Sequence, residues 1–340
     1  MEGLKMPYQR ALILAAALCL TMSSAVQADC DGHDLFPALK SEAPAAYAAI
    51  ETAAGAMPFR HGKLFRLSRP GSEPSYLFAT LHLSDPRVTG FSPRLTATLT
   101  NSKIVVLETV ETGDVLRRAV RNDPAAWRRA TLARENHRAD NLLSKTDFKQ
   151  LESLAARRGF LKSVAREFNA STLALLLDLS ACTVRLPGTR PPYLDQLIAN
   201  IARENKIETV GLESMIEQIE ILNGLPRETE RDLLIAVLRR AERSEDFVET
   251  QIVRYAEGDI GGLLTWLQSA EPVRGVAQAQ IPLAFVDRLV TLRNHRMRDR
   301  ALAFLTRGGA FIAVGAVHLP GKEGLLSLFE AEGYHVDALE

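Results

Sequence analysis

Short apolar segments alternate with longer stretches of helical periodicity along this chain. The short segments have the apolar or alternating composition of β-strands, and they cover residues 62–68, 76–82, 104–108, 208–213, 310–318 and 334–339. Helical patterns cover residues 31–58, 93–101, 114–178, 194–205, 214–306 and 323–332. Because strands separated by helices are typical of α/β folds, the pattern predicts a mainly parallel sheet with covering helices and large helical insertions.

The first 28 residues have the layout of a secretory signal peptide. Lys5 and Arg10 precede an apolar stretch at residues 11–22, and the segment ends on Ala28. A helix of about a dozen residues is too short to cross a bilayer core of about 30 Å, so cleavage after Ala28 is favoured over an uncleaved anchor. We therefore expect residues 29–340 to form one periplasmic or secreted α/β domain without a membrane span.

Charge and cysteine content narrow the possible partners and compartment. The chain has 41 basic and 41 acidic side chains, and this balance argues against a nucleic acid partner. The basic residues within 293–300 have no interleaved aromatics and indicate a solvated helix face. Cys30 and Cys182 remain after signal removal, and an oxidising compartment would favour a disulfide between them.

Four of the predicted strands end on a side chain that can bind a metal or transfer a proton. These side chains are His82, Glu108, Glu213 and His318. Parallel strands point their carboxyl ends toward one edge of the sheet, the edge where open α/β folds bind ligands. A single strand-end glutamate is weak evidence, since strands often lead into polar residues. Two histidines and two glutamates in the same position together predict a functional site at this edge.

Several short motifs in this order resemble the TraB/GumN family. They are Ala79-Thr-Leu-His82 followed by Asp85-Pro-Arg-Val88, then Gly211-Leu-Glu213, Arg293-Asn294 and Gly315-Ala-Val-His318-Leu-Pro-Gly321. The resemblance covers roughly residues 60–340. Characterised Tiki-type members of that family are metal-dependent peptidases, so the resemblance implies a peptide or protein substrate.

The resemblance further implies a centre made of His82, Glu108 and His318, supported by Arg293. Two imidazoles and a carboxylate suit a divalent transition metal such as manganese, cobalt, iron or zinc better than calcium or magnesium. Glu108 or Glu213 could instead act as general base, and Arg293 could stabilise an oxyanion or bind a substrate carboxylate. One departure from the family is Ala79, where the first motif usually has glycine. Strand alternation predicts that Ala79 faces away from the metal, whereas a bulge would let its methyl group crowd the site.

The sequence thus favours an exported, peptidase-like metal-dependent hydrolase over two alternatives. The alternatives are a non-catalytic protein that binds a metal, haem or peptide, and an inactive family member that acts as an interaction scaffold. No GxSxG, P-loop or HExxH motif supports another enzyme class. Asp195 is interpreted as a helix N-terminal acid and His295 as a surface residue. The sequence does not determine the oligomeric state.

Overall fold

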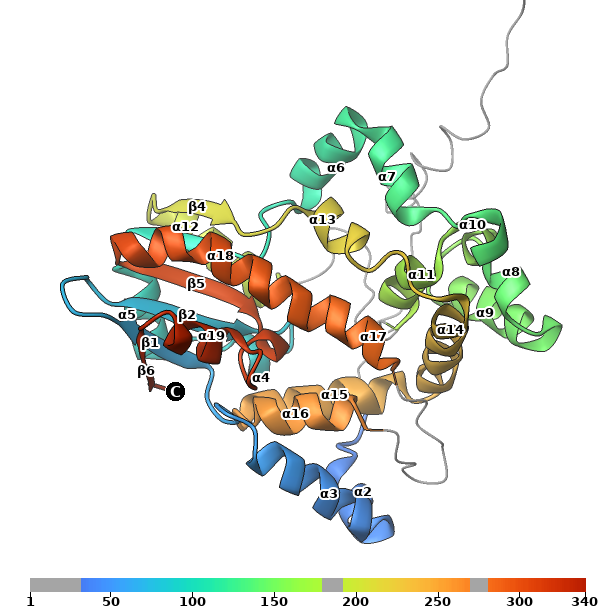
Figure 1. Cartoon of the computed structure of the whole chain (residues 1–340), viewed down its shortest axis with the longest axis horizontal. Coiled ribbons are helices and arrows are strands. Elements are labelled where there is room, and N and C mark those ends of the chain that lie inside the picture. The colour runs from blue at the N-terminus through green and yellow to red at the C-terminus, as the bar shows by residue number, and fades with distance from the viewer. Residues whose placement is uncertain (1–31, 179–191, 270–280) are drawn as a thin grey trace, which may run out of the picture.

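The structure, a computed structural model, describes residues 32–178, 192–269 and 281–340, and its core is a six-stranded sheet (Figure 1). The strand order is β4-β3-β5-β2-β1-β6. The neighbours β4, β3, β5 and β2 are parallel, whereas β1 is antiparallel to both β2 and β6. The predicted mainly parallel α/β sheet is therefore confirmed. The strands are β1 (Leu64–Ser68), β2 (Ser75–Thr80), β3 (Ile104–Leu107), β4 (Glu208–Gly211), β5 (Ala310–Gly315) and β6 (His335–Ala338).

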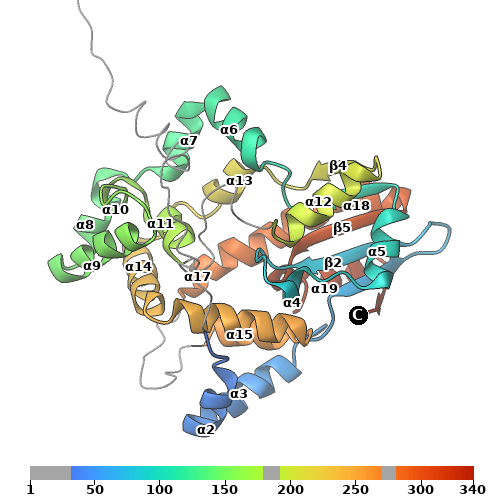
Figure 2. The ribbon, with the colours of Figure 1, turned by 180° about the vertical axis from the view of Figure 1, so that it is seen from behind.

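Helices cover both faces of this sheet. Figure 1 shows α18 (Leu292–Arg307) and α19 (Leu325–Ala331) on one face, and Figure 2 shows α5 (Pro93–Thr100) and α12 (Leu194–Glu204) on the other. The central strand β5 is buried along nearly its whole length because both of its faces are covered. Its apolar residues and those of β2 and β3 form the main core together with Leu99, Ile198 and Met297 from the helices.

The remaining helices form a helical region beside the carboxyl edge of the strands, together with a smaller group near the amino end of the chain. A second apolar core joins helices from the middle of the chain and includes Leu151, Leu173, Leu234 and Phe285. A third joins the first two helices to Trp266. These helices are α2 (Phe36–Glu42), α3 (Pro44–Gly55), α4 (Pro86–Thr89), α6 (Gly113–Asn122), α7 (Pro124–Thr131), α8 (Ala139–Leu142), α9 (Lys145–Arg157), α10 (Val164–Glu167), α11 (Ala170–Leu177), α13 (Met215–Glu220), α14 (Arg227–Ala241), α15 (Ser244–Ala256), α16 (Ile260–Leu267) and α17 (Leu283–Val286).

Three shorter helical turns lie among the described residues. They are the 3-10 turns η1 (Glu135–His137) and η3 (Ala316–His318), and the π-helical turn η2 (Asp287–Thr291) that joins α17 to α18. A π-helical turn interrupts the regular hydrogen bonding of a helix and is frequent near functional sites. Here it lies just before Arg293, one of the predicted site residues.

Element boundaries differ from the sequence predictions in a consistent way. The expected helix over residues 31–58 is divided at Ala43, because Pro44 lacks the amide hydrogen needed to continue α2. Four strands end one to three residues earlier than predicted, so that His82, Glu108, Glu213 and His318 follow the strands. No helix within the described residues is long and apolar enough to cross a membrane. The predicted signal peptide, Cys30 and Cys182 lie outside the described residues.

Candidate functional site

Four predicted site residues follow four neighbouring parallel strands. His82 lies two residues after β2, and His318 ends the 3-10 turn that follows β5. Glu108 directly follows β3, and Glu213 lies two residues after β4. Because β2, β5, β3 and β4 are adjacent in this order, the fold brings these side chains to one edge of the sheet.

A buried cation joins the two glutamates. The Nε atom of Arg293 donates a hydrogen bond of 2.9 Å to Glu213 Oε2, and its Nη2 atom donates to Glu108 Oε1. The side chains of Arg293, Glu108 and Glu213 are only 5%, 9% and 0% exposed. The backbone amide of Gly315 donates to the other Glu108 oxygen at 3.1 Å. The sheet edge thus contains one buried guanidinium bound to two carboxylates.

This arrangement separates the acidities of the two glutamates. Burial opposes ionisation of Glu108, but Arg293 and the two histidines hold its pKa well below its ordinary value. The pKa of Glu213 is raised instead, because burial outweighs the attraction of Arg293 and the Glu108 charge opposes a second negative charge. Burial would lower the pKa of Arg293, yet both carboxylates raise it. Glu108 is therefore the firmly ionised carboxylate of the pair.

His318 is a buried, neutral imidazole. Only 3% of the residue is exposed, and its Nδ1 atom lies 2.7 Å from Asn294 Oδ1 on α18. Burial and the nearby charge of Arg293 lower the pKa of His318 to about 3. The amide oxygen can only accept, so Nδ1 carries the hydrogen, and Nε2 keeps its lone pair. This tautomer is the one that a metal ligand requires.

His82 has a different environment. Its Nδ1 atom lies 2.8 Å from Asp195 Oδ2 on α12, and the second Asp195 oxygen accepts a 2.7 Å hydrogen bond from the Thr80 hydroxyl. The His82 side chain is 61% exposed to solvent. Many protein atoms nevertheless lie close around its ring. This crowding lowers the pKa of His82, but the charge and hydrogen bond of Asp195 and the charge of Glu108 outweigh it and raise the pKa to about 9.

The residues match a metal in the kind of donor they offer, although they do not form a complete set of ligands. Each imidazole is held through Nδ1 by an oxygen of the chain, as in metal-binding histidines. Both oxygens of Glu108, however, are bonded to Arg293 and Gly315. Within the ranges that the structure describes, no three His, Cys, Asp or Glu side chains are grouped closely enough to hold a metal ion. The two imidazoles therefore suit a transition metal, whereas Glu108 is hydrogen-bonded to Arg293 and Gly315 and is not grouped with them closely enough to be a third ligand.

The two GxxH-like motifs are not in equivalent register. Parallel pairing of β2 with β5 sets Thr80 beside Gly315 and Ala79 beside Val314. A methyl group added at Gly315 would lie 3.4 Å from Glu108 Oε2 and from the His318 ring. Ala79 is fully buried, and by strand alternation its side chain points to the face opposite that of Thr80, which contacts Asp195. Its methyl group is therefore directed away from the side on which His82 is held.

Sequence reasoning missed the role of Asp195. This residue does lie in the first turn of α12, as expected of a helix N-terminal acid, but it also binds His82 across 113 positions of the chain. No local pattern distinguishes such an acid from an ordinary one. Asn294 belonged to a recognised motif, and the structure adds its contact with His318. His295 lies outside the site and pairs with Glu323 on the surface, in agreement with its interpretation as a surface residue.

The chain matches a known protein family and resembles a characterised protein. The profile described as the TraB/PrgY/gumN family matches residues 64–338. The chain is also similar to the protein named metalloprotease TIKI2 from Danio rerio, at 26% identity over 328 residues. This alignment covers 81% of the present chain but only 60% of that relative's length. No solved structure matches the chain significantly.

Proposed function

Because the chain belongs to the TraB/PrgY/gumN family, as its motifs predicted, we propose that it is an exported, metal-dependent hydrolase acting on peptides or proteins. It is distantly related to a metalloprotease, and this relationship suggests a metal and a protein or peptide substrate. The proposal assigns His82, His318 and Glu108 to the metal centre, with manganese, cobalt or zinc as the ion.

The observation that carries the proposal is the matched support of two imidazoles at neighbouring strand ends. His82 and His318 each have Nδ1 bound to an oxygen acceptor, so the ring orientation is fixed and Nε2 is directed away from that acceptor. Glu108 follows the next strand in the sheet and is ionised, so it supplies the negative charge that a cation centre requires.

A metal ion bound here would supply an activated water molecule as the nucleophile for amide hydrolysis. In this proposal Glu108 is a ligand of the centre and not the general base, because its carboxylate borders the imidazoles and its lowered pKa makes it a weak proton acceptor. Arg293 and Glu213 act as positioning residues, because Glu213 is fully buried and Arg293 is held between both carboxylates. Asp195 and Asn294 orient the two imidazoles.

A second candidate function is non-catalytic binding of a metal, haem or peptide at the same edge. One observation favours it: the cation of Arg293 already neutralises Glu108, the carboxylate that the metal centre needs. An inactive scaffold would keep this ion pair permanently. The two candidates differ in whether the metal-loaded protein hydrolyses peptide bonds.

Metal content and turnover separate these functions. The purified protein is treated with a chelator, reloaded with manganese, cobalt or zinc, and examined by elemental analysis and by mass spectrometry of peptide mixtures. We expect one bound ion per chain and new peptide termini. His82→Ala and His318→Ala should each reduce metal affinity more than about 100-fold, beyond the loss typical of supporting residues.

The matched control is His295→Ala, because His295 is a surface histidine that pairs with Glu323 outside the site. It should retain metal and turnover. Full metal retention by both site variants would contradict the shared centre. Bound metal without cleavage of any peptide would favour the binding function instead.

Export is tested separately from chemistry. Intact mass measurement of the protein from its native host should show loss of residues 1–28, if the signal peptide is removed after Ala28. A mass that includes these residues would contradict cleavage and would favour the uncleaved anchor.

A further inference from the structure

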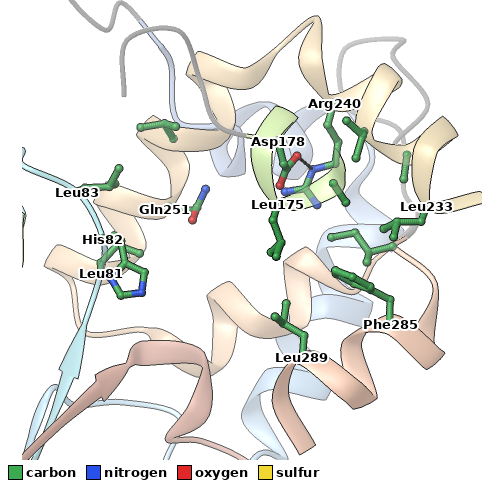
Figure 3. Close-up of a pocket in the computed structure, with 15 residues that line it drawn as sticks. Leu81, His82, Leu83, Leu175, Asp178, Leu233, Arg240, Gln251, Phe285 and Leu289 are labelled. Atoms are coloured by element: carbon green, nitrogen blue, oxygen red, sulfur yellow. Dashed lines mark ion pairs between the residues drawn. The ribbon is translucent and has the colours of Figure 1, made fainter. Parts of the chain in front are cut away.

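A cavity of about 290 Å³ opens beside His82 (Figure 3). One wall is the segment after β2 that contains His82, and the others come from α11, α14, α15, α17 and the π-helical turn. Figure 3 shows Leu175, Phe285 and Leu289 facing the hollow from the side opposite His82. The cavity thus lies between His82, one residue of the candidate metal centre, and the helical region, which the proposed chemistry does not otherwise use.

The cavity wall is mostly apolar, and its two charged members besides His82, which are Asp178 and Arg240, form an ion pair. Four of the fifteen lining residues are polar: His82, Asp178, Arg240 and Gln251. Arg240 Nε is buried and makes no hydrogen bond within the described residues, but it lies 3.2 Å from Asp178 Oδ1 in an ion pair, and the guanidinium lies 4.7 Å from the centre of the Phe247 ring. Gln251 donates to a backbone carbonyl, and His82 is bound to Asp195. Because the lining charges are paired within the chain, the cavity favours an uncharged apolar occupant over a carboxylate or a phosphate.

Size and exposure agree with an apolar ligand. The volume is about ten times the space of one water molecule, about 30 Å³, so the cavity can hold a large aliphatic or aromatic group. Leu175 on its wall is 39% exposed, whereas most leucines of the helical core are buried. A ligand that covers Leu175 would remove this apolar surface from water and gain binding energy from it.

We infer that this cavity is a specificity pocket that binds a large apolar side chain of a peptide substrate, next to the bond that is cleaved. The inference rests on the proposed function, because His82 belongs both to the cavity wall and to the proposed metal centre. A peptide whose scissile carbonyl lies at the centre would have an adjacent side chain within reach of the cavity. The substrate class is therefore peptides with leucine, phenylalanine or a similar residue beside the scissile bond.

The test uses two readouts on the full chain. The probes are fluorescently labelled, end-blocked alanine-glycine heptapeptides that differ only at the central residue, which is leucine, phenylalanine or asparagine. Fluorescence anisotropy measures their binding to the chelator-treated protein, and mass spectrometry measures their cleavage by the metal-loaded protein. We expect leucine and phenylalanine peptides to bind about tenfold or more tightly than the asparagine peptide, the discrimination typical of apolar pockets.

Two substitutions locate this preference in the cavity. Leu175→Asn makes an exposed part of the wall polar with little risk to folding, and Ala236→Phe fills part of the cavity. Both should reduce the preference for leucine to less than about threefold, from the tenfold preference expected of such a pocket. The matched control is Leu161→Asn, because Leu161 is 50% exposed and does not line the cavity. It should leave the preference unchanged.

The two readouts distinguish the inference from the proposed function. Equal binding of the three peptides, or an apolar preference that Leu175→Asn and Ala236→Phe both leave intact, would overturn the pocket even if peptides are cleaved. Selective binding that both variants abolish would support the pocket even if no peptide is cleaved, and in that case only the hydrolytic function fails.

Discussion

The two histidines that follow neighbouring strands β2 and β5 lie in opposite environments. His318 is 3% exposed, neutral and supported by an uncharged amide, with its pKa lowered to about 3. His82 has a side chain that is 61% exposed and supported by the carboxylate of Asp195, with its pKa raised to about 9. His318 thus lies buried at the edge of the sheet, and His82 lines the cavity.

The difference shows that similar motifs can supply unlike parts of one site. A neutral buried imidazole is a ready electron-pair donor, since no proton must leave before it binds a metal. An imidazolium stabilised by a carboxylate must release a proton first, and it can approach a substrate because it is accessible. His318 is therefore part of the buried interior, whereas His82 is accessible to a ligand. Four experiments address this contrast, in order of decreasing expected effect.

Removing the buried cation should have the largest effect. Arg293→Met would leave Glu108 and Glu213 buried without their shared partner, so we expect the free energy of unfolding to fall by about 3–5 kcal/mol. Urea denaturation followed by circular dichroism measures it. The control on the same helix is Arg300→Met, which removes a half-exposed pair with Glu217 and should cost no more than about 1 kcal/mol. Equal losses of stability in the two variants would show that the buried ion pairs of Arg293 contribute no more to the fold than the half-exposed pair of Arg300.

Asn294→Leu tests the support of His318. The substitution leaves the buried Nδ1 hydrogen of His318 and the carbonyl of Glu323 without the amide, so stability should fall by about 1–3 kcal/mol. The same denaturation assay applies. Asn200→Leu is the control, because among the described residues the Asn200 side chain has a single hydrogen bond, an exposed one accepted from Arg203 on α12. A loss no larger than that of the control would mean that His318 does not depend on this amide.

Proton NMR of the metal-free protein can compare the histidines directly. We expect His82 to titrate near pH 9 and His318 to stay neutral until about pH 3. Asp195→Asn should lower the pKa of His82 by at least about one unit and leave that of His318 unchanged. Resonances are assigned with His82→Gln and His318→Gln. Coincident titration of both rings near pH 6.5 would remove the contrast.

These pKa values imply opposite effects on stability. The folded pKa of His82 lies above its ordinary value of 6.5, so its contribution is complete below pH 6.5 and is lost as the pH rises through 9. The folded pKa of His318 lies below 6.5, so its contribution is present above pH 6.5 and is lost as the pH falls toward 3.

The smallest effect on stability is expected at the two motif positions. Gly315→Ala would add a methyl group at ordinary contact distance from Glu108 and His318, so stability should change by less than about 1 kcal/mol while metal binding weakens. Ala79→Gly should cost a similar amount through added backbone freedom and leave metal binding unchanged. Thermal unfolding and metal titration measure both variants. Weaker metal binding in Ala79→Gly would show that Ala79 does face the site.

Much of the architecture was predictable from local patterns. The apolar segments ending near His82, Glu108 and His318 are all strands of the sheet, because a strand buried on both faces needs a continuous apolar run. Element ends were less accurate, since the hydrogen bonds that end a strand come from distant segments. The helical stretch over residues 114–178 was recognised, but its division into several helices was not.

The sequence by itself indicated the family, through short motifs in a set order, and the mainly parallel α/β class and the strand-end side chains, because local apolar patterns mark the strands and helices. Only the tertiary structure decided that Asp195 supports His82 and that Arg293 binds Glu108 from 185 positions away. It also decided which histidine is buried and which lines a cavity. The physical reason is that ionisation, tautomer and accessibility depend on neighbours in space, and long-range packing alone selects those neighbours.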